Sequence, residues 1–135
     1  MSGRLAALTG ATGFLGRALA QALSSSGYDL RMLVRPDVEP PAAGELVHGR
    51  LHDRQALERL AAGADLVVHA AGLVKARRPE DFRPVNVQGV RDIAEATARL
   101  APQARFVLVS SLSAREPQLS AYAASKAAGE AAARA

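Results

Sequence analysis

Tyr122 and Lys126 are the residues whose types and spacing best fit catalysis. They are four apart in Ala121–Ala135, a segment that predicts a helix, so their side chains share one face. A tyrosine phenol ionises only well above neutral pH, and a lysine ammonium one turn away favours the ionised form. Ser111, or alternatively Ser113, lies a loop's length earlier and can hydrogen-bond a carbonyl or hydroxyl oxygen. Together these side chains predict a proton relay suited to work beside a hydride donor, although Tyr–Lys pairs also occur on plain helix surfaces.

Three glycines, Gly10, Gly13 and Gly16, stand between an apolar run ending at Thr9 and an amphipathic run starting at Phe14. This order predicts a strand, a tight turn and a helix start, where unpaired backbone N–H groups and the helix dipole favour a phosphate. The spacing is G-x-x-G-x-x-G rather than G-x-G-x-x-G, and no G-K-[ST] follows, which disfavours a P-loop NTPase. An ordinary turn between a strand and a helix remains the alternative.

Arg35 follows the second predicted strand, about twenty residues beyond the glycine turn. A dinucleotide with a free ribose 2′-hydroxyl usually meets an Asp or Glu at this position. Arginine cannot accept a hydroxyl proton, but it pairs well with a phosphate. The sequence therefore favours NADP over NAD, with a solvated surface arginine as the alternative.

Five strands alternate with helices along the chain, which indicates a parallel α/β sheet with helices on both faces. Strands are expected at Leu5–Thr9, Asp29–Val34, Leu46–His48, Asp65–Ala71 and Phe106–Val109. Helices are expected at Phe14–Leu23, from the N-cap Asp53 to Gly63, from Pro79 or Pro84 to just before Pro102, and at Ala121–Ala135, with a proline-rich loop at Pro40–Gly44. Right-handed crossovers predict the strand order 3-2-1-4-5, and ligands then bind beyond the carboxyl ends of the strands.

The bulk composition limits the function classes. The chain has 135 residues, 49% hydrophobic and 22% charged, which fits one globular domain, and it has no cysteine for a disulfide. No apolar run approaches the roughly 18 residues of a membrane span, and no signal-peptide pattern opens the chain. We therefore expect a cytoplasmic protein without a membrane partner. The net charge of +4 comes with scattered arginines and only two tyrosines and three phenylalanines, which disfavours nucleic-acid binding.

Histidines in the chain do not predict a metal site. His48, His52 and Asp53 lie close in sequence, but a metal centre needs three or four converging ligands, and we expect none. Asp53 is better explained as a helix N-cap. His69, in an apolar strand, is expected to be a packed core histidine.

Five motifs in order resemble the short-chain dehydrogenase/reductase superfamily, in its extended or atypical NAD(P)-dependent epimerase/dehydratase branch. They are TGATGFLG at Thr9–Gly16, VVHAAG at Val67–Gly72, NVQG at Asn86–Gly89, VSS at Val109–Ser111 and YAASK at Tyr122–Lys126. The resemblance covers essentially the whole chain and implies a Rossmann-like fold, a nicotinamide cofactor and a Ser111/Tyr122/Lys126 active site. Asn86 is implied to anchor a helix near the site.

The glycine turn, the end of the second strand and the resemblance together predict the cofactor contacts. The expected cofactor-binding residues are Gly10, Thr12, Gly13, Phe14, Leu15, Gly16, Arg35, Leu51, Ala70, Ala71, Gly72, Tyr122 and Lys126. The resemblance further implies a small-molecule substrate with a carbonyl or hydroxyl group and a homodimer formed through helices. A Rossmann module that keeps the cofactor without catalysis is the alternative, although the retained tyrosine and lysine argue against it.

Two departures from the family pattern stand out. Many relatives carry Gly-Asp-Leu after the third strand, where this chain has Gly49-Arg50-Leu51. Relatives are also roughly twice as long, which leads us to expect that residues 1–135 are the NAD(P)-binding domain of a longer protein, without the C-terminal strands and the substrate-binding part.

Overall fold

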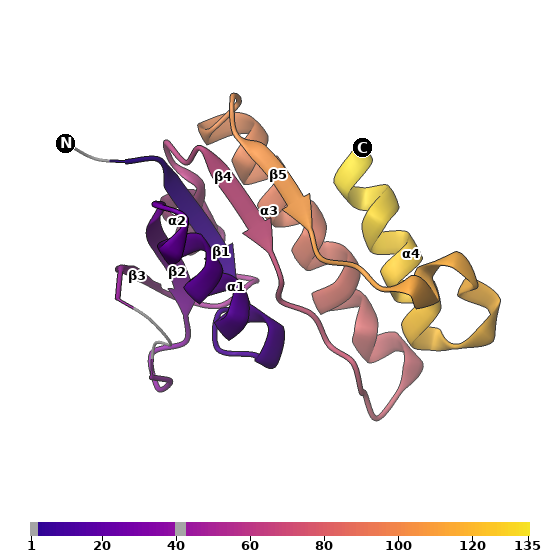
Figure 1. Ribbon diagram of the computed structural model, residues 1–135. Coiled ribbons are helices and arrows are strands. Elements are labelled where there is room, and N and C mark those ends of the chain that lie inside the picture. Colours follow the sequence, from indigo (N-terminus) through magenta and orange to yellow (C-terminus); the bar gives the residue numbers. More distant parts are fainter. Residues whose placement is uncertain (1–2, 40–42) are drawn as a thin grey trace.

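A computed structural model describes residues 3–39 and 43–135, which form a five-stranded parallel sheet in the order β3-β2-β1-β4-β5 (Figure 1). The strands are β1 (Leu5–Thr9), β2 (Asp29–Val34), β3 (Glu45–His48), β4 (Leu66–His69) and β5 (Arg105–Leu108). The helices are α1 (Phe14–Ser25), α2 (Arg54–Ala61), α3 (Gly89–Leu100) and α4 (Ala121–Arg134). The predicted fold class and strand order are confirmed, while most of the predicted Pro40–Gly44 loop lies outside the described residues.

The two faces of the sheet are covered by different helices, because neighbouring residues of a strand point to opposite faces. Ala7 of β1 belongs to a core with Leu57 of α2 and Ile93 of α3. Its neighbour Leu8 belongs to a second core with Ala20 of α1. Every one of these side chains is almost fully buried, and the helices on both faces confirm the doubly wound arrangement.

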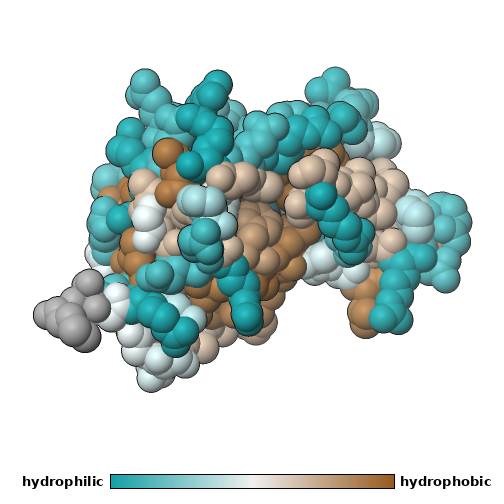
Figure 2. Space-filling view, turned by 90° about the horizontal axis from the view of Figure 1, so that it is seen from above, coloured by the Kyte–Doolittle hydropathy of each residue, from teal (hydrophilic) through white to brown (hydrophobic). Residues whose placement is uncertain are grey.

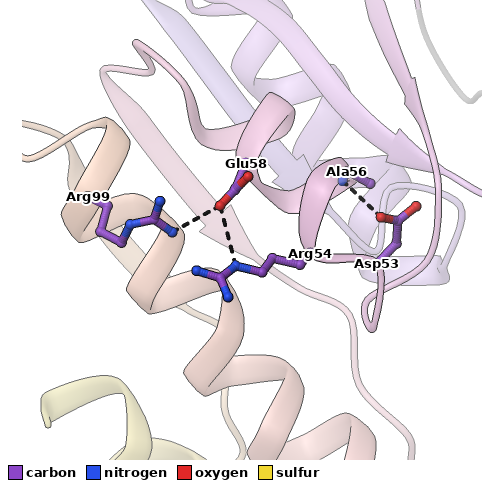
Figure 3. Close-up of polar contacts among 5 residues, drawn as sticks. All are labelled: Asp53, Arg54, Ala56, Glu58 and Arg99. Atoms are coloured by element: carbon purple, nitrogen blue, oxygen red, sulfur yellow. Dashed lines mark hydrogen bonds and ion pairs between the residues drawn. The ribbon is translucent and has the colours of Figure 1, made fainter.

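Side chains hold α2 at both ends. At its N-terminus the Asp53 carboxylate accepts a hydrogen bond of 3.2 Å from the backbone N–H of Ala56, as the sequence predicted (Figure 3). At its C-terminus Arg31 of β2 donates through Nη1 to the carbonyl oxygens of residues 59, 60 and 62. Since these carbonyls have no partner within the helix, a guanidinium there satisfies them and complements the helix dipole.

An ion-pair network joins α2 to α3 on the surface. Glu58 of α2 lies 3.4 Å from Arg54 and 2.9 Å from Arg99 of α3 (Figure 3). The hydrogen bond from Arg99, which outweighs the opposing effect of burial, lowers the pKa of Glu58. Because both arginines are exposed and Glu58 is only half-buried, the network adds little to the free energy of unfolding.

Several element boundaries differ from the sequence prediction. Strand β4 ends at His69 rather than Ala71, because the hydroxyl oxygen of Thr9 shares the Ala70 N–H with the Thr9 carbonyl and accepts the Ala71 N–H. Strand β5 begins and ends one residue earlier than predicted. Helix α1 continues two residues beyond Leu23.

The remaining segments are short helical turns at the carboxyl end of the sheet. The chain between β4 and α3 contains a 3-10 turn, η1 (Pro79–Asp81), and a π-helical turn, η2 (Pro84–Gln88), that runs directly into α3. The predicted loop after β5 contains two further 3-10 turns, η3 (Leu112–Arg115) and η4 (Pro117–Leu119). They bring the chain to the start of α4, which lies beyond β5 in Figure 1.

Strand β5 forms one edge of the sheet, and its side chains are exposed or half-buried. Val107 on this strand keeps 39% of its surface exposed. In Figure 2, apolar residues gather in the middle of the visible face, with hydrophilic residues around them.

No helix within residues 3–39 and 43–135 has the length and hydropathy to cross a bilayer.

Candidate active site

The glycine turn after β1 is pressed against the end of β4. Gly10 has a positive φ of 73°, and a Cβ atom there would lie 2.5 Å from the backbone nitrogen of Ala71. A Cβ atom at Gly16 would overlap the carbonyl oxygen of Gly10. Gly13, whose N–H donates to the Gly10 carbonyl at 3.1 Å, has only that oxygen near its open side. Two of the three glycines are therefore needed for packing, and the third keeps the backbone open to a ligand.

A cleft of 450 Å³ lies between this turn and the ends of the neighbouring strands; we call it the glycine-turn cleft. It is lined by Gly10, Thr12, Gly13, Leu33, Arg35, Gly49, Arg50, Leu51, His52, Ala70, Ala71, Gly72 and Val85. The N-terminus of α1 opens beside it without a side-chain cap or an acidic residue in the first turn. Such an end attracts an anion, so the turn fits the diphosphate of a dinucleotide.

Positive charge gathers at the far end of the glycine-turn cleft. Arg35 follows β2, and Arg50 follows β3. These two strands are paired, and the Gly49 N–H extends the pairing with a hydrogen bond of 3.1 Å to the Val34 carbonyl. Within the described part of the chain, no Asp or Glu lines this cleft. Sequence reasoning chose Arg35 and treated Arg50 only as a departure from the family pattern. The arginine at position 50, where many relatives carry an aspartate, was the sequence feature that could have indicated a second positive charge in this cleft.

A second cleft of 200 Å³ continues from the first; we call it the Tyr122 cleft. Its lining comprises Leu15, Ala70, Gly72, Leu73, Val74, Val109, Ser110, Tyr122 and Lys126. Ala70 and Gly72 line both clefts, which therefore share one edge. The predicted tyrosine and lysine meet here, beside the end of the glycine-turn cleft.

Lys126 is a buried ammonium, with 7% of the residue exposed. Its Nζ donates to the carbonyl oxygen of Val109 at 3.1 Å, which ties α4 to the chain just after β5. Burial lowers the pKa of Lys126, and the carboxylate of Glu130, one turn along, partly opposes that effect. The ring of Tyr122 packs edge-on against Phe82, with ring centroids 5.9 Å apart.

The serines after β5 occupy different positions. Ser111 lies outside the lining of the Tyr122 cleft, and its Oγ accepts a bond of 3.1 Å from the N–H of Ser113 at the start of η3. Ser110 does line the cleft, and its buried Oγ has no partner among the described residues. The sequence placed Ser110 in the VSS motif after the fifth strand, but Ser111 was the serine predicted as a site residue.

Asn86 in the π-helical turn holds the base of the site together. Its amide exchanges two hydrogen bonds of 2.8 Å with the backbone of Leu73 and donates at 3.0 Å to Ser125 of α4. Gly129 of α4 crosses so close to the Asn86 carbonyl that a Cβ atom would overlap it. These contacts are those of a residue that anchors the turn before α3, as expected for Asn86. The sequence itself did not indicate that position 129 needs a glycine.

Other predicted residues lie away from the two clefts. Phe14, the first residue of α1, lines neither cleft, and its side chain is 97% exposed. Gly16 is buried beneath the turn. No group of three or more metal-binding side chains occurs within residues 3–39 and 43–135, and His52 instead lines the glycine-turn cleft.

Comparison with known proteins identifies the family. The model of the NAD dependent epimerase/dehydratase family matches residues 6–135. The chain belongs to this family. It is 55% identical over 133 residues to the ceramide reductase of Caulobacter vibrioides, a match that covers 96% of this chain and 41% of that protein.

Two further similarities extend this result. The chain is 37% identical over 108 residues to the 4-hydroxy-2-methyl-3-oxo-4-farnesyl-3,4-dihydroquinoline-1-oxide ketoreductase of Stigmatella aurantiaca, covering 76% of this chain and 32% of the relative. A short-chain dehydrogenase/reductase superfamily protein from Agrobacterium tumefaciens, solved with bound NAD, superposes with a TM-score of 0.82 at 27% identity, covering 97% of this chain and 44% of that one. The chain thus spans less than half the length of these relatives.

Proposed function

We propose that this domain holds NADP(H) for a reductase whose substrate is a carbonyl compound with a long hydrocarbon chain. The observation that supports the proposal is the edge at Ala70 and Gly72, which is shared by the glycine-turn cleft and by the cleft that Tyr122 and Lys126 line. When bound, the reduced nicotinamide supplies a hydride to the carbonyl carbon. The protein must then deliver a proton to the carbonyl oxygen.

In this proposal, Tyr122 donates that proton from its phenol oxygen. The ammonium of Lys126 stabilises the phenolate that remains, and it is fixed for this task by its bond to the Val109 carbonyl. Ser111, next to Ser110 at the border of the Tyr122 cleft, is proposed to hydrogen-bond the substrate oxygen. Since its Oγ already accepts from the Ser113 N–H, its own hydroxyl proton is free to donate.

The preference for NADP rests on charge. A ribose 2′-phosphate adds about two negative charges, and two guanidiniums, Arg35 and Arg50, line the glycine-turn cleft without a carboxylate beside them in the described chain. A bare ribose would leave both arginines without an anionic partner. The bound NAD in the Agrobacterium structure belongs to that protein, and we propose the other dinucleotide for this one.

The substrate class rests on the lining of the Tyr122 cleft and on the relatives. Leu15, Leu73, Val74 and Val109 give this cleft a largely aliphatic wall. The names of two relatives describe reductases of ceramide and of a farnesylated quinoline oxide, both of which carry long hydrocarbon chains. A hydrocarbon chain gains free energy by covering such a wall, whereas a nucleotide sugar does not.

The test is reduction by the full-length protein of an oxidised ceramide, with a ketone in place of one hydroxyl, presented in detergent micelles with NADPH. We expect NADPH to be consumed, and Tyr122→Phe to lower turnover at least about 100-fold. If a nucleotide sugar is converted and the keto lipid is not, the substrate class is wrong. If Tyr122→Phe turns over like the wild type, the tyrosine is not the proton donor and a domain that binds the cofactor without catalysis becomes the better account.

A further inference from the structure

Thr9 and His69 form a buried polar pair that the proposed chemistry does not use. They face each other across β1 and β4, and Thr9 Oγ1 lies 2.6 Å from His69 Nδ1. Both residues are completely buried. Thr9 Oγ1 also receives hydrogen bonds from the backbone N–H groups of Ala70 at 3.1 Å and Ala71 at 3.2 Å.

This arrangement determines where the proton of the imidazole sits. The Thr9 hydroxyl has one proton to donate, and its oxygen already accepts from two backbone N–H groups. The hydroxyl proton therefore points to His69 Nδ1, which must be the unprotonated nitrogen. The ring proton is then on Nε2, a buried atom with no partner among the described residues. Burial, followed by the positive charge of Lys126, lowers the pKa of His69 to about 4, which keeps the ring neutral near pH 7.

The pair is joined by hydrogen bonds to Ala70–Gly72, the segment that contributes to the lining of both clefts. Ala70 and Ala71 follow the last residue of β4, and Thr9 Oγ1 is the side-chain acceptor for both of their N–H groups. The Ala70 N–H is shared with the backbone carbonyl of Thr9, at 3.3 Å, whereas the Ala71 N–H donates to the hydroxyl oxygen. The same edge stands against Gly10, where a Cβ atom would lie 2.5 Å from Ala71 N. A displacement of Ala70–Gly72 would therefore change the width of the glycine-turn cleft and the position of the Tyr122 cleft beside it.

We propose that Thr9 and His69 are positioning residues that fix the Ala70–Gly72 edge for dinucleotide binding. His69 orients the Thr9 hydroxyl so that its lone pairs face the two N–H groups. The inference rests on the proposed function, since it concerns how the same clefts hold the cofactor. It assigns a role to a histidine that the sequence alone suggested was only core packing.

Three variants of the full-length protein separate this role from simple packing. Thr9→Val removes the hydroxyl, and His69→Leu removes the acceptor. His69→Asn keeps an acceptor, because the asparagine Oδ1 occupies roughly the place of Nδ1. We expect Thr9→Val and His69→Leu to raise the dissociation constant for NADPH by about five- to tenfold, since one or two hydrogen bonds lose their geometry. His69→Asn should stay within about twofold of the wild type.

Ile93→Val is the control for a loss of packing, because Ile93 is fully buried on α3 and touches neither cleft. It should lower thermal stability while leaving NADPH affinity unchanged. The steady-state KM for NADPH should rise in Thr9→Val and His69→Leu by a larger factor than kcat falls. Equal affinities in the wild type, Thr9→Val and His69→Leu would overturn the positioning role while leaving the proposed function intact.

Nuclear magnetic resonance tests the pair without any ligand. The ring nitrogens of His69 should report an Nε2–H tautomer, and the amides of Ala70 and Ala71 should exchange slowly with solvent. Thr9→Val and His69→Leu should accelerate that exchange, and His69→Asn should restore it. If the wild type binds neither NADPH nor NADH, the proposed function fails, whereas an Nδ1–H tautomer or unchanged amide exchange overturns the pair itself.

Discussion

Gly10 lies directly against Ala71, two residues beyond the end of strand β4, since a Cβ atom on Gly10 would lie 2.5 Å from the Ala71 nitrogen. Gly10 also has a positive φ of 73°. The short distance to Ala71 leaves no space for a side chain at Gly10, and the positive φ disfavours any residue other than glycine there. The geometry of the cleft therefore depends on one glycine as much as on the residues that face the ligand.

Gly10→Ala should abolish dinucleotide binding and destabilise the fold by at least about 2 kcal/mol. Gly63→Ala is a matched control, because Gly63 has a φ of 68° but nothing within 4 Å of a new Cβ atom. The control variant should lose about 1 kcal/mol and keep its affinity. Urea unfolding and NADPH titration of both variants measure the difference, and equal losses would show that backbone strain, not the contact with Ala71, matters.

Asn86→Ala should lower the free energy of unfolding by about 2–4 kcal/mol, because it leaves the part-buried N–H and carbonyl of Leu73 without their partner and removes the donor to Ser125, whose hydroxyl keeps only its own bond to the Tyr122 carbonyl. Gln88→Ala, on the exposed side of the same π-helical turn, should change it by less than about 0.5 kcal/mol. Chemical denaturation gives both values. A loss below 1 kcal/mol for Asn86→Ala would contradict its anchoring role.

The neutral His69 predicts a pH dependence of stability. Its pKa is about 4 in the folded protein against the ordinary histidine value of 6.5, so between these values the unfolded chain binds a proton that the folded chain does not. Stability from this group is therefore complete above pH 6.5 and declines as the pH falls to 4, by about 3 kcal/mol in all.

His69→Asn has no proton to bind in this range, so its stability should change less between pH 7 and pH 4. Denaturant unfolding at several pH values compares the two proteins. Parallel curves for the wild type and the variant would mean that His69 titrates normally in the folded state.

Lys126→Met should separate catalysis from folding. The variant removes the ammonium and its bond to the Val109 carbonyl, so we expect turnover by the full-length protein to fall by about 100-fold or more. Stability should change by no more than about 2 kcal/mol in either direction, since removing the lysine also removes the cost of burying its charge. Turnover within threefold of the wild type would contradict the electrostatic role of Lys126.

Local sequence signals predicted most of the fold because they are strong here. The glycine turn, the N-cap Asp53 and the apolar runs each act over a few residues, and the strand order follows from general rules of handedness. The predicted end of β4 was wrong by two residues, because the hydroxyl of Thr9, on another strand, shares the N–H of Ala70 and accepts the N–H of Ala71. No local pattern encodes such a bond.

The candidate site was harder to predict wherever it depends on contacts between distant segments. Tyr122 and Lys126 were predicted from their spacing, whereas Arg50 and Ser110 enter the clefts only because strands from different parts of the chain end together. Gly129 is likewise explained by its crossing with Asn86 and not by its neighbours in sequence. His69 was predicted to be a packed core residue. Its hydrogen bond to Thr9 joins two neighbouring strands that are 60 residues apart in sequence, so no local pattern indicates it.

The central claim is that the edge between the glycine turn and β4 holds NADP(H), with Arg35 and Arg50 at its phosphate end. Fluorescence titration of the full-length protein with NADPH and NADH tests it most directly. We expect micromolar binding of NADPH, about tenfold or more weaker binding of NADH, and loss of that preference in the Arg35→Gln/Arg50→Gln double variant, since two charge-assisted contacts disappear. Failure of both dinucleotides to bind below the millimolar range, or equal preference in the wild type and the double variant, would contradict the account.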